Sequence, residues 1–179
     1  MTEQSEAGAS PEPIGLCGGD LWRVVGAPGG GIGRLQSQDA QTVPIDLIRV
    51  QADGTTLWAC AHVIARNSWW SGPVVAVMNA DRAGGWRLAP AAHPNDGRLH
   101  VVHTGCDGAA ALSFAQRLLA RRRLGAGTHV PHPAIALRRV EQAEFSFERP
   151  MGLWLDGERV AKCRTLEVSI EPDAATVVF

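Results

Sequence analysis

The sequence predicts a mostly-β (α+β) fold, a β-sandwich of many short antiparallel strands with one main helix. Three observations support this class. Short apolar runs recur at intervals of about eight to twelve residues, between Gly- and Asp-rich turn signals. Only one segment, about residues 107–123, repeats its leucines at helical spacing. Hydrophobic residues make up 45% and charged residues 20% of the 179 residues, which suits one packed domain.

The N-terminal segment and the composition indicate the bounds of the domain and its cellular compartment. Residues 1–13 are rich in Glu, Ser, Ala and Pro and lack the basic and apolar regions of a signal peptide, so a disordered leader is expected before one domain at 14–179. No run approaches the roughly 18 apolar residues of a membrane span. The net charge of −1 argues against nucleic-acid binding. A cytoplasmic protein with four reduced thiols is expected, since no C-x-x-C pair occurs among Cys17, Cys60, Cys106 and Cys163.

The first elements are a helical turn and a hairpin. After the Gly-rich start, Asp20 is expected to cap one or two helical turns that stop at Gly26. Val43–Gln51 is predicted to be a strand. Residues 52–55 (Ala-Asp-Gly-Thr) are a hairpin turn signal, and Thr56–Ile64 is predicted to be the returning strand.

The later strands are expected at short apolar or alternating runs. Gly72–Asn79 is continuously apolar up to its last residue, which suits a strand buried on both faces. A tight turn at 95–97 leads into a strand at Arg98–Thr104. After the helix the expected strands are, in chain order, Ala134–Val140, Ala143–Arg149, Gly152–Leu155, Thr165–Ile170 and Ala175–Phe179.

The acidic turn Asp156-Gly157-Glu158 is the first candidate functional site. It joins an apolar strand to a segment that begins near Arg159. Its ordinary interpretation is an Asp-Gly hairpin turn with a solvated Glu158. Its functional interpretation is a carboxylate, from Asp156 or Glu158, that a strand end holds as a general base or a metal ligand.

A second candidate is the loop that contains Asp96, between Leu88 and Leu99. It is either a plain turn into a strand or a loop in which Asp96 and nearby carbonyl oxygens hold a hard divalent cation. The Gly-rich start at Gly15–Asp20 does not match the G-x-x-x-x-G-K-[ST] pattern. The sequence therefore predicts no nucleotide site.

Two pairs of histidines are spaced three residues apart, yet neither pair predicts a zinc site. In a strand, an odd separation sends His100 and His103 to opposite faces. His129 and His132 flank a proline in an expected loop. No carboxylate or thiolate lies at metal spacing from either pair, so zinc is not expected.

Tryptophans and arginines supply two further candidate surfaces. Most tryptophans are expected in the core or at its edge. Trp69 and Trp70 are adjacent and do not easily both point inward, so one of them is expected to line an apolar groove or an interface. The arginine cluster is either a solvated face or a patch for lipid headgroups or phosphate, and consists of Arg117, Arg121, Arg122, Arg123, Arg138 and Arg139.

Taken in order, these motifs resemble the diacylglycerol kinase family, which includes bacterial lipid kinases and the sphingosine and ceramide kinases. The Leu-Ala-Pro element at 88–90 and the Asp-Gly-Glu element at 156–158 are the more specific ones. The matching stretches are Gly18–Pro28, Val43–Val50, Gly85–Val102, Gly127–His129 and Leu155–Glu158.

The resemblance implies a fold and a set of site residues. Members of that family have a nucleotide-binding α/β lobe followed by a β-sandwich lobe, and this chain resembles only the second. By resemblance, Glu158 is the proton acceptor for the lipid hydroxyl. Asp96, with the backbone carbonyls of His93 and Arg98, is expected to hold a structural Mg²⁺ or a similar cation.

Two departures from the family pattern bear on function. Gly18-Gly19-Asp20 stands where the family usually has Gly-Asn-Asp, and the segment Arg66–Ser71 is shorter than its usual counterpart at the lipid entrance. The first departure argues against nucleotide contact at that turn, and the second argues against the usual lipid entrance. Because a lobe with the base but no phosphate cradle should not transfer phosphate alone, the expected function is a stand-alone, non-catalytic module, a pseudoenzyme, that binds lipid or protein. The alternative is one subunit of a split lipid kinase that docks with a separately encoded nucleotide-binding lobe and uses Glu158 as base. A structural homodimer that seals its β edges by pairing is a third hypothesis.

Overall fold

The computed structural model describes residues 12–104, 113–125 and 135–179. Its helices are α1 (Gly19–Val24), α2 (Gly31–Leu35) and α3 (Phe114–Gly125). Its strands are β1 (Ile14–Gly15), β2 (Thr42–Ala52), β3 (Thr55–Ala59), β4 (His62–Arg66), β5 (Val74–Met78), β6 (Leu99–Thr104), β7 (Ile135–Val140), β8 (Gln142–Leu155) and β9 (Glu158–Val178).

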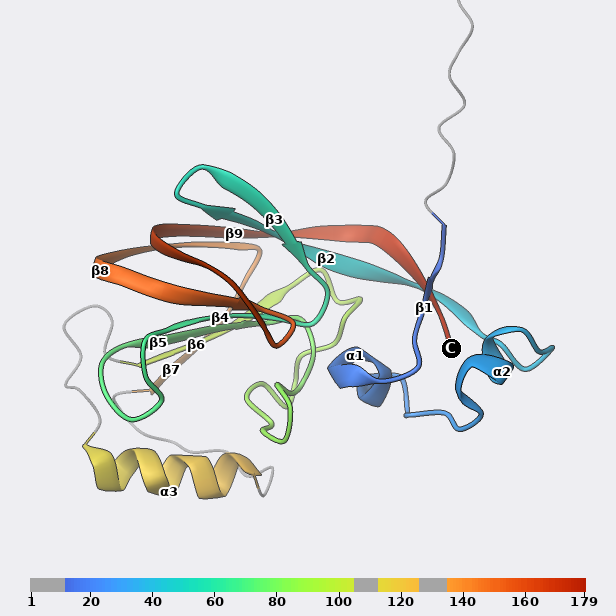
Figure 1. Ribbon diagram of the computed structural model, residues 1–179, viewed down its shortest axis with the longest axis horizontal. Helices are drawn as coiled ribbons and strands as arrows, with labels where there is room; N and C mark the ends of the chain where they lie inside the picture. The colour runs from blue at the N-terminus through green and yellow to red at the C-terminus, as the bar shows by residue number, and fades with distance from the viewer. Residues whose placement is uncertain (1–11, 105–112, 126–134) are drawn as a thin grey trace, which may run out of the picture.

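The strands form one nine-stranded sheet that folds over into two facing layers (Figure 1). The strand order is β3-β2-β9-β8-β4-β5-β6-β7, and β1 pairs with β9. The upper layer in Figure 1 contains β2, β3 and β9, and the lower layer contains β4 to β7. The long strand β8 belongs to both layers, because its first half pairs with β9 alone and its second half also pairs with β4. The mostly-β sandwich predicted from the sequence is confirmed.

The predicted hairpin is present, but its returning strand is shorter than expected. Asp53 (φ 46°) and Gly54 (φ 84°) both have positive φ, as a two-residue hairpin turn requires. The prediction of one strand from Thr56 to Ile64 is wrong. The strand ends at Ala59, the chain crosses from the upper to the lower layer at residues 60–61, and β4 then begins at His62.

Four strands predicted near the C-terminus are parts of two long ones. Ala143–Arg149 and Gly152–Leu155 both lie in β8, and Thr165–Ile170 and Ala175–Phe179 both overlap β9. Proline has no N–H to donate, and Pro150 lies in the bulge of β8 where the pairing with β9 shifts register. Such bulges bend a strand and increase its twist, and so one strand serves both layers.

Two aspartates bind the backbone of β9 where its pairing is interrupted. Opposite the bulge in β8, the Asp53 carboxylate accepts hydrogen bonds from the backbone N–H groups of Arg164 (3.0 Å) and Thr165 (2.8 Å). These bonds lower the pKa of Asp53 below its usual value. Where β9 shifts register against β2, the buried Asp46 accepts the N–H of Asp173 at 3.0 Å. The N–H groups that leave the ladder are thus paired again.

The main core lies between the two layers and takes apolar side chains from both. Its fully buried members share the inward face of their strands, and include Ile48 and Val50 of β2, Val63 of β4, Val75 and Val77 of β5, and Leu153 of β8. A second cluster covers the outer face of the lower layer, where Leu88, Ala89 and Ala92 pack on Ile64, Ala76 and Met78. The loop that contains Asp96 follows directly from this cover.

The small helix α1 packs against one end of the sandwich. Leu21 is buried with Ile45 of β2 and with Val177 near the end of β9. The residue that precedes the helix is Gly18, so the prediction of Asp20 as N-cap is wrong. Gly26, with φ 95°, follows the helix as expected for a stop signal. The Asp20 carboxylate is therefore available for contacts outside its own helix.

The main helix, α3, begins later than the predicted 107–123, at Phe114. Residues 107–112 of that prediction lie outside the described ranges, as do the leader to residue 11, Cys106, His129 and His132. In Figure 1, α3 lies beyond the lower layer, on the side away from β9. The buried side chain of Arg117 holds α3 against the loop after β4 by donating to the carbonyls of Gly72 (2.6 Å) and Trp69 (3.4 Å). No helix in the described parts is long and apolar enough to cross a membrane.

Candidate functional site

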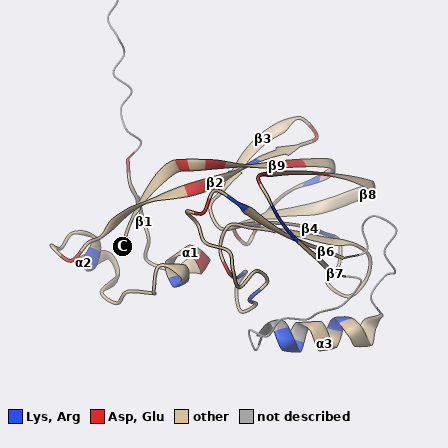
Figure 2. Cartoon of the chain, turned by 180° about the vertical axis from the view of Figure 1, so that it is seen from behind, with Lys and Arg blue, Asp and Glu red and all other residues tan. Residues whose placement is uncertain are grey.

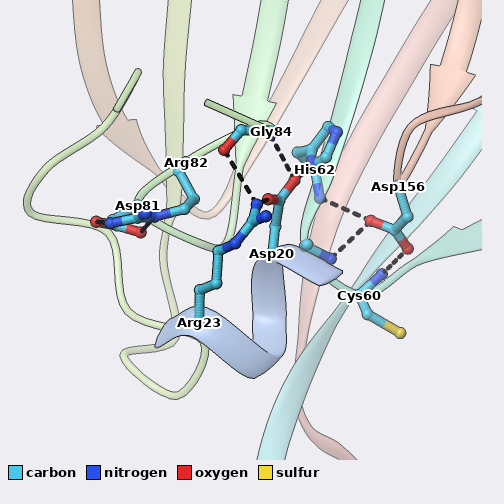
Figure 3. A network of polar contacts seen from close by, with 9 residues as sticks. Asp20, Arg23, Cys60, His62, Asp81, Arg82, Gly84 and Asp156 are labelled. Carbon is cyan, nitrogen blue, oxygen red and sulfur yellow. Dashed lines mark hydrogen bonds and ion pairs between the residues drawn. The ribbon is translucent and has the colours of Figure 1, made fainter. Parts of the chain in front are cut away.

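The crossing between the layers is built around Asp156. Its carboxylate accepts hydrogen bonds from three consecutive backbone N–H groups, those of Cys60 (2.7 Å), Ala61 (2.8 Å) and His62 (2.9 Å). In return, the Asp156 N–H donates to the carbonyl of His62 at 3.0 Å. Figure 3 shows this carboxylate facing the crossing segment. The crossing is thereby fixed to the turn between β8 and β9.

Asp156 and Gly157 form the predicted Asp-Gly turn, with φ values of 49° and 94°. Because both carboxylate oxygens already accept N–H groups, Asp156 positions the backbone at this place. A direct part for it in catalysis stays a prediction. The turn sets the direction in which the next side chain leaves the sheet, and that side chain is Glu158.

Glu158 is the first residue of β9 and lies opposite Leu155 in the hairpin. Its side chain is exposed and makes no hydrogen bond or ion pair with any described residue. An exposed carboxylate on a tightly held turn can accept a proton from a molecule that docks there. The geometry suits the proton acceptor predicted by resemblance, a role that stays a prediction.

A second carboxylate, Asp20 of α1, approaches the same crossing from the other side (Figure 3). It accepts the backbone N–H of Gly84 at 2.7 Å and a hydrogen bond from Arg23 at 3.0 Å. Its Oδ2 lies 3.7 Å from Nδ1 of His62. The His62 side chain is only 4% exposed and that nitrogen has no hydrogen-bond partner.

His62 is thus a buried imidazole between two aspartates. Burial lowers its pKa, and the negative charges of Asp156 and Asp20 offset part of that effect. Burial also raises the pKa of the nearby Cys60 thiol to about 11, with help from Asp156, so the protonated thiol is a poor nucleophile. Sequence reasoning did not single out His62, since it lies inside an apolar run and both of its acidic neighbours are distant in sequence.

The loop that contains Asp96 is the other candidate, and one side chain connects it to the crossing. Asn79 is fully buried and donates to the carbonyls of Asp46 and Cys60, both at 2.8 Å. Asp46 in turn accepts the N–H of Gly97 at 2.8 Å and donates its own N–H to Pro94 at 2.7 Å. The two candidate sites therefore share one hydrogen-bonded network.

The contacts of Asp96 do not fit an open cation site. One carboxylate oxygen accepts the N–H of Arg98 at 3.0 Å. The other lies 3.0 Å from a guanidinium nitrogen of Arg139 and 3.4 Å from Nε2 of His100. The donors already face the oxygens that a hard cation would need. The described residues also contain no group of three or more His, Cys, Asp or Glu side chains that could hold a metal ion, a finding that does not concern the backbone carbonyls of His93 and Arg98. A part for those two carbonyls stays a prediction.

The remaining predicted residues lie apart from these two places. His100 and His103 are both buried, and His103 contacts Arg138 and Phe145. Of the adjacent tryptophans, Trp69 packs on Trp86 with ring centroids 4.7 Å apart, whereas Trp70 is 38% exposed beside Phe114. The two rings thus do not both point inward, as predicted, and a groove or an interface at Trp70 stays a prediction.

Comparison with known proteins agrees with this architecture. Residues 39–179 match the family model described as YegS C-terminal NAD kinase beta sandwich-like domain. The fold is therefore the C-terminal β-sandwich lobe found in diacylglycerol kinase-type proteins. The chain belongs to this YegS C-terminal domain family, which confirms the resemblance seen in the sequence.

Solved structures support the same fold. A crystal structure of a diacylglycerol kinase from Bacillus anthracis str. Sterne has a TM-score of 0.67 and 13% identity, and covers 92% of this chain and 66% of its own. Two further structures from this strain, provisionally described as diacylglycerol kinases, have TM-scores of 0.68, identities of 13% and 12%, and cover 92% of this chain and 68% and 69% of their own. No curated protein matches the sequence. The chain thus spans about two thirds of these kinase chains, and the likeness concerns the fold.

The first prediction concerns the acceptor at the crossing. Asp156→Ala leaves three backbone N–H groups without their carboxylate and places alanine at positive φ, so we expect the free energy of unfolding to fall by about 2–4 kcal/mol. Asp156→Asn keeps one acceptor oxygen, so its free energy of unfolding should fall by roughly half as much. Urea unfolding followed by tryptophan fluorescence measures both. Glu158→Gln is the control and should stay within about 0.5 kcal/mol of the wild type. An Asp156→Ala variant as stable as this control contradicts the structural role of Asp156.

The second prediction concerns pH. Because burial lowers the pKa of folded His62 below the ordinary value of 6.5, the unfolded chain binds a proton that the folded chain does not. The His62 contribution to stability is thus complete above pH 6.5 and falls as the pH drops from there toward the folded pKa. Urea unfolding between about pH 8 and about pH 5 should show a flatter loss of stability for His62→Gln than for the wild type. Parallel curves would rule this linkage out.

Proposed function

We propose that this chain is a lipid-kinase C-terminal lobe that binds a lipid surface and does not transfer phosphate by itself. The observation that carries the proposal is the outward face of α3. There, exposed apolar side chains lie beside arginines, in a chain whose fold is similar to solved structures described as diacylglycerol kinases.

The outward face of α3 is apolar. Arg117 and Ala120 point toward the rest of the molecule and are buried. The opposite side exposes Phe114 (63%), Leu118 (41%) and Leu119 (50%). Trp70 extends this surface, since its ring centroid is 5.4 Å from that of Phe114. We call these four residues, Trp70, Phe114, Leu118 and Leu119, the α3 face.

The charges on α3 suit an anionic surface. Its last turn carries Arg122 and Arg123, and the helix contains no Asp or Glu. Figure 2 shows basic but no acidic segments along α3. A helix with apolar and aromatic side chains beside arginines is typical of segments that lie in the headgroup region of a membrane. This supports the lipid-surface interpretation of part of the arginine cluster, although Arg117 itself is buried and serves the packing of α3.

Phosphoryl transfer depends on holding and neutralising the phosphates of the nucleotide. The 179 residues contain no Gly-rich phosphate-binding pattern with its lysine, and Lys162 is their only lysine. A lobe with a candidate base and no phosphate-binding loop cannot hold the nucleotide phosphates in position for transfer. This supports a binding role for the chain by itself.

The second candidate is one half of a split lipid kinase. The observation that favours it is the exposed Glu158 on a turn that three N–H groups hold in place. A separately encoded nucleotide-binding lobe that docks beside this turn would bring a phosphate donor to a lipid hydroxyl, and Glu158 would accept the proton. The cytoplasm is the compartment we propose for either function.

The third prediction tests the α3 face. The wild-type chain should co-sediment with vesicles of mixed phosphatidylcholine and phosphatidylglycerol, less with phosphatidylcholine alone, and less as salt rises. Trp70→Ser combined with Leu118→Ser should lower the partition coefficient by about tenfold or more, since two exposed apolar side chains that enter the bilayer on binding are lost. Trp58→Ser combined with Val160→Ser is the matched control, because these side chains are similarly exposed but lie on β3 and β9, away from α3. Equal partition of both double variants would contradict the proposal.

The fourth prediction separates the two candidate functions. The purified chain, given ATP, Mg²⁺ and diacylglycerol in mixed micelles, should yield no phosphatidic acid above background. Glu158→Gln should leave vesicle binding unchanged. If the chain alone phosphorylates the lipid and Glu158→Gln removes that activity, the binding role is wrong. Activity that appears only after a nucleotide-binding lobe is added, and that needs Glu158, supports the split kinase.

A further inference from the structure

Three donors from different parts of the chain converge on the Asp96 carboxylate. The N–H of Arg98 comes from the same loop, and His100 comes from β6. The guanidinium of Arg139 comes from β7, where Arg139 lies directly opposite His100 in the antiparallel pairing. The register of β6 and β7 therefore delivers both side chains to one carboxylate.

The charge at this place is already balanced. Asp96 is largely buried, with 17% of its side chain exposed, and in the described part of the chain the arginine that contacts its carboxylate is Arg139, 3.0 Å from Oδ2. His100 is 6% exposed and lies 3.4 Å from the same oxygen. A divalent cation bound to that oxygen would lie next to the guanidinium, and like charges at such a distance repel each other.

The loop is also fixed without a cation on either side of Asp96. Gly97 donates its N–H to the buried Asp46 at 2.8 Å, and the carbonyl of Pro94 accepts the N–H of Asp46 at 2.7 Å. Asn95 donates its side-chain amide to Pro44 at 3.0 Å. What the loop needs at Asp96 is a positive charge, and not further ligands.

We propose that the Arg139 guanidinium takes the place of the structural cation that the family resemblance assigns to Asp96. The loop is thus closed by a charge of the protein, and its stability does not depend on a divalent metal. This inference goes beyond the proposed lipid-binding function and does not rest on it.

The fifth prediction tests this with thermal unfolding of the full chain in EDTA and in millimolar Mg²⁺ or Ca²⁺ at matched ionic strength. The wild-type melting temperature should be the same in all three. Arg139→Gln should melt about 2–6 °C lower in EDTA, and the divalent cation should restore part of that loss. Asp96→Asn in the Arg139→Gln background should abolish the response to cation. Arg149→Gln, an exposed arginine of β8, is the control and should behave as the wild type.

Three results would overturn the proposal. One is a wild-type melting temperature that rises with Mg²⁺ or Ca²⁺ and loses that rise in Asp96→Asn. Another is an Arg139→Gln variant that melts as the wild type does. The last is a destabilised Arg139→Gln variant that does not respond to either cation. If Arg139→Gln does not fold, Arg139→Lys keeps the charge, and its melting temperature should not respond to the cation. Calorimetric titration of the wild type with Mn²⁺ should then show no binding. Mn²⁺ binding that is lost in Asp96→Asn contradicts the proposal.

Discussion

The sandwich depends on one constraint: a backbone N–H that loses its partner in a sheet needs another acceptor. The sheet is interrupted where the chain crosses between the layers after β3, at the bulge of β8 before Met151, and where β9 shifts register against β2, and an aspartate carboxylate lies at each of these three places. Asp156 serves the crossing, Asp53 serves β9 opposite the bulge of β8, and Asp46 serves the bulge of β9. A carboxylate suits this task because it only accepts hydrogen bonds and has two oxygens to offer.

The candidate sites take their shape from these interruptions. The turn that carries Glu158 is rigid because its aspartate serves the crossing, and the loop of Asp96 is placed because Asp46 binds Gly97. Asn79 connects the two sites, because its side-chain amide donates to the carbonyls of Asp46 and Cys60. A disturbance at one site is therefore expected to reach the other through a buried amide rather than through the apolar core. The two candidate sites thus lie at polar interruptions of an otherwise regular sheet.

Local patterns in the sequence predicted much of the fold and less of the site. The hairpin at 52–55 and the strand Val74–Met78 are set by neighbouring residues, so both were predictable. The break after Ala59 was not, because its cause is Asp156, 96 residues away from Cys60. For the same reason, the Asp-Gly turn was predicted from its two residues, whereas the three N–H groups that its carboxylate binds were not. The contact between Arg139 and Asp96 was not predictable either, because it depends on the register between β6 and β7.

The short strand β1 pairs in parallel with the end of β9, with Ile14 beside Val177, and so both ends of the described chain leave the sandwich at the same place (Figure 1). Ends that lie this close permit circular permutation. A short linker between them, with new termini opened in an exposed loop such as that at Gly29, would keep every strand pair and every aspartate contact described above. The chain order of the strands could then change while their order in the sheet stays the same.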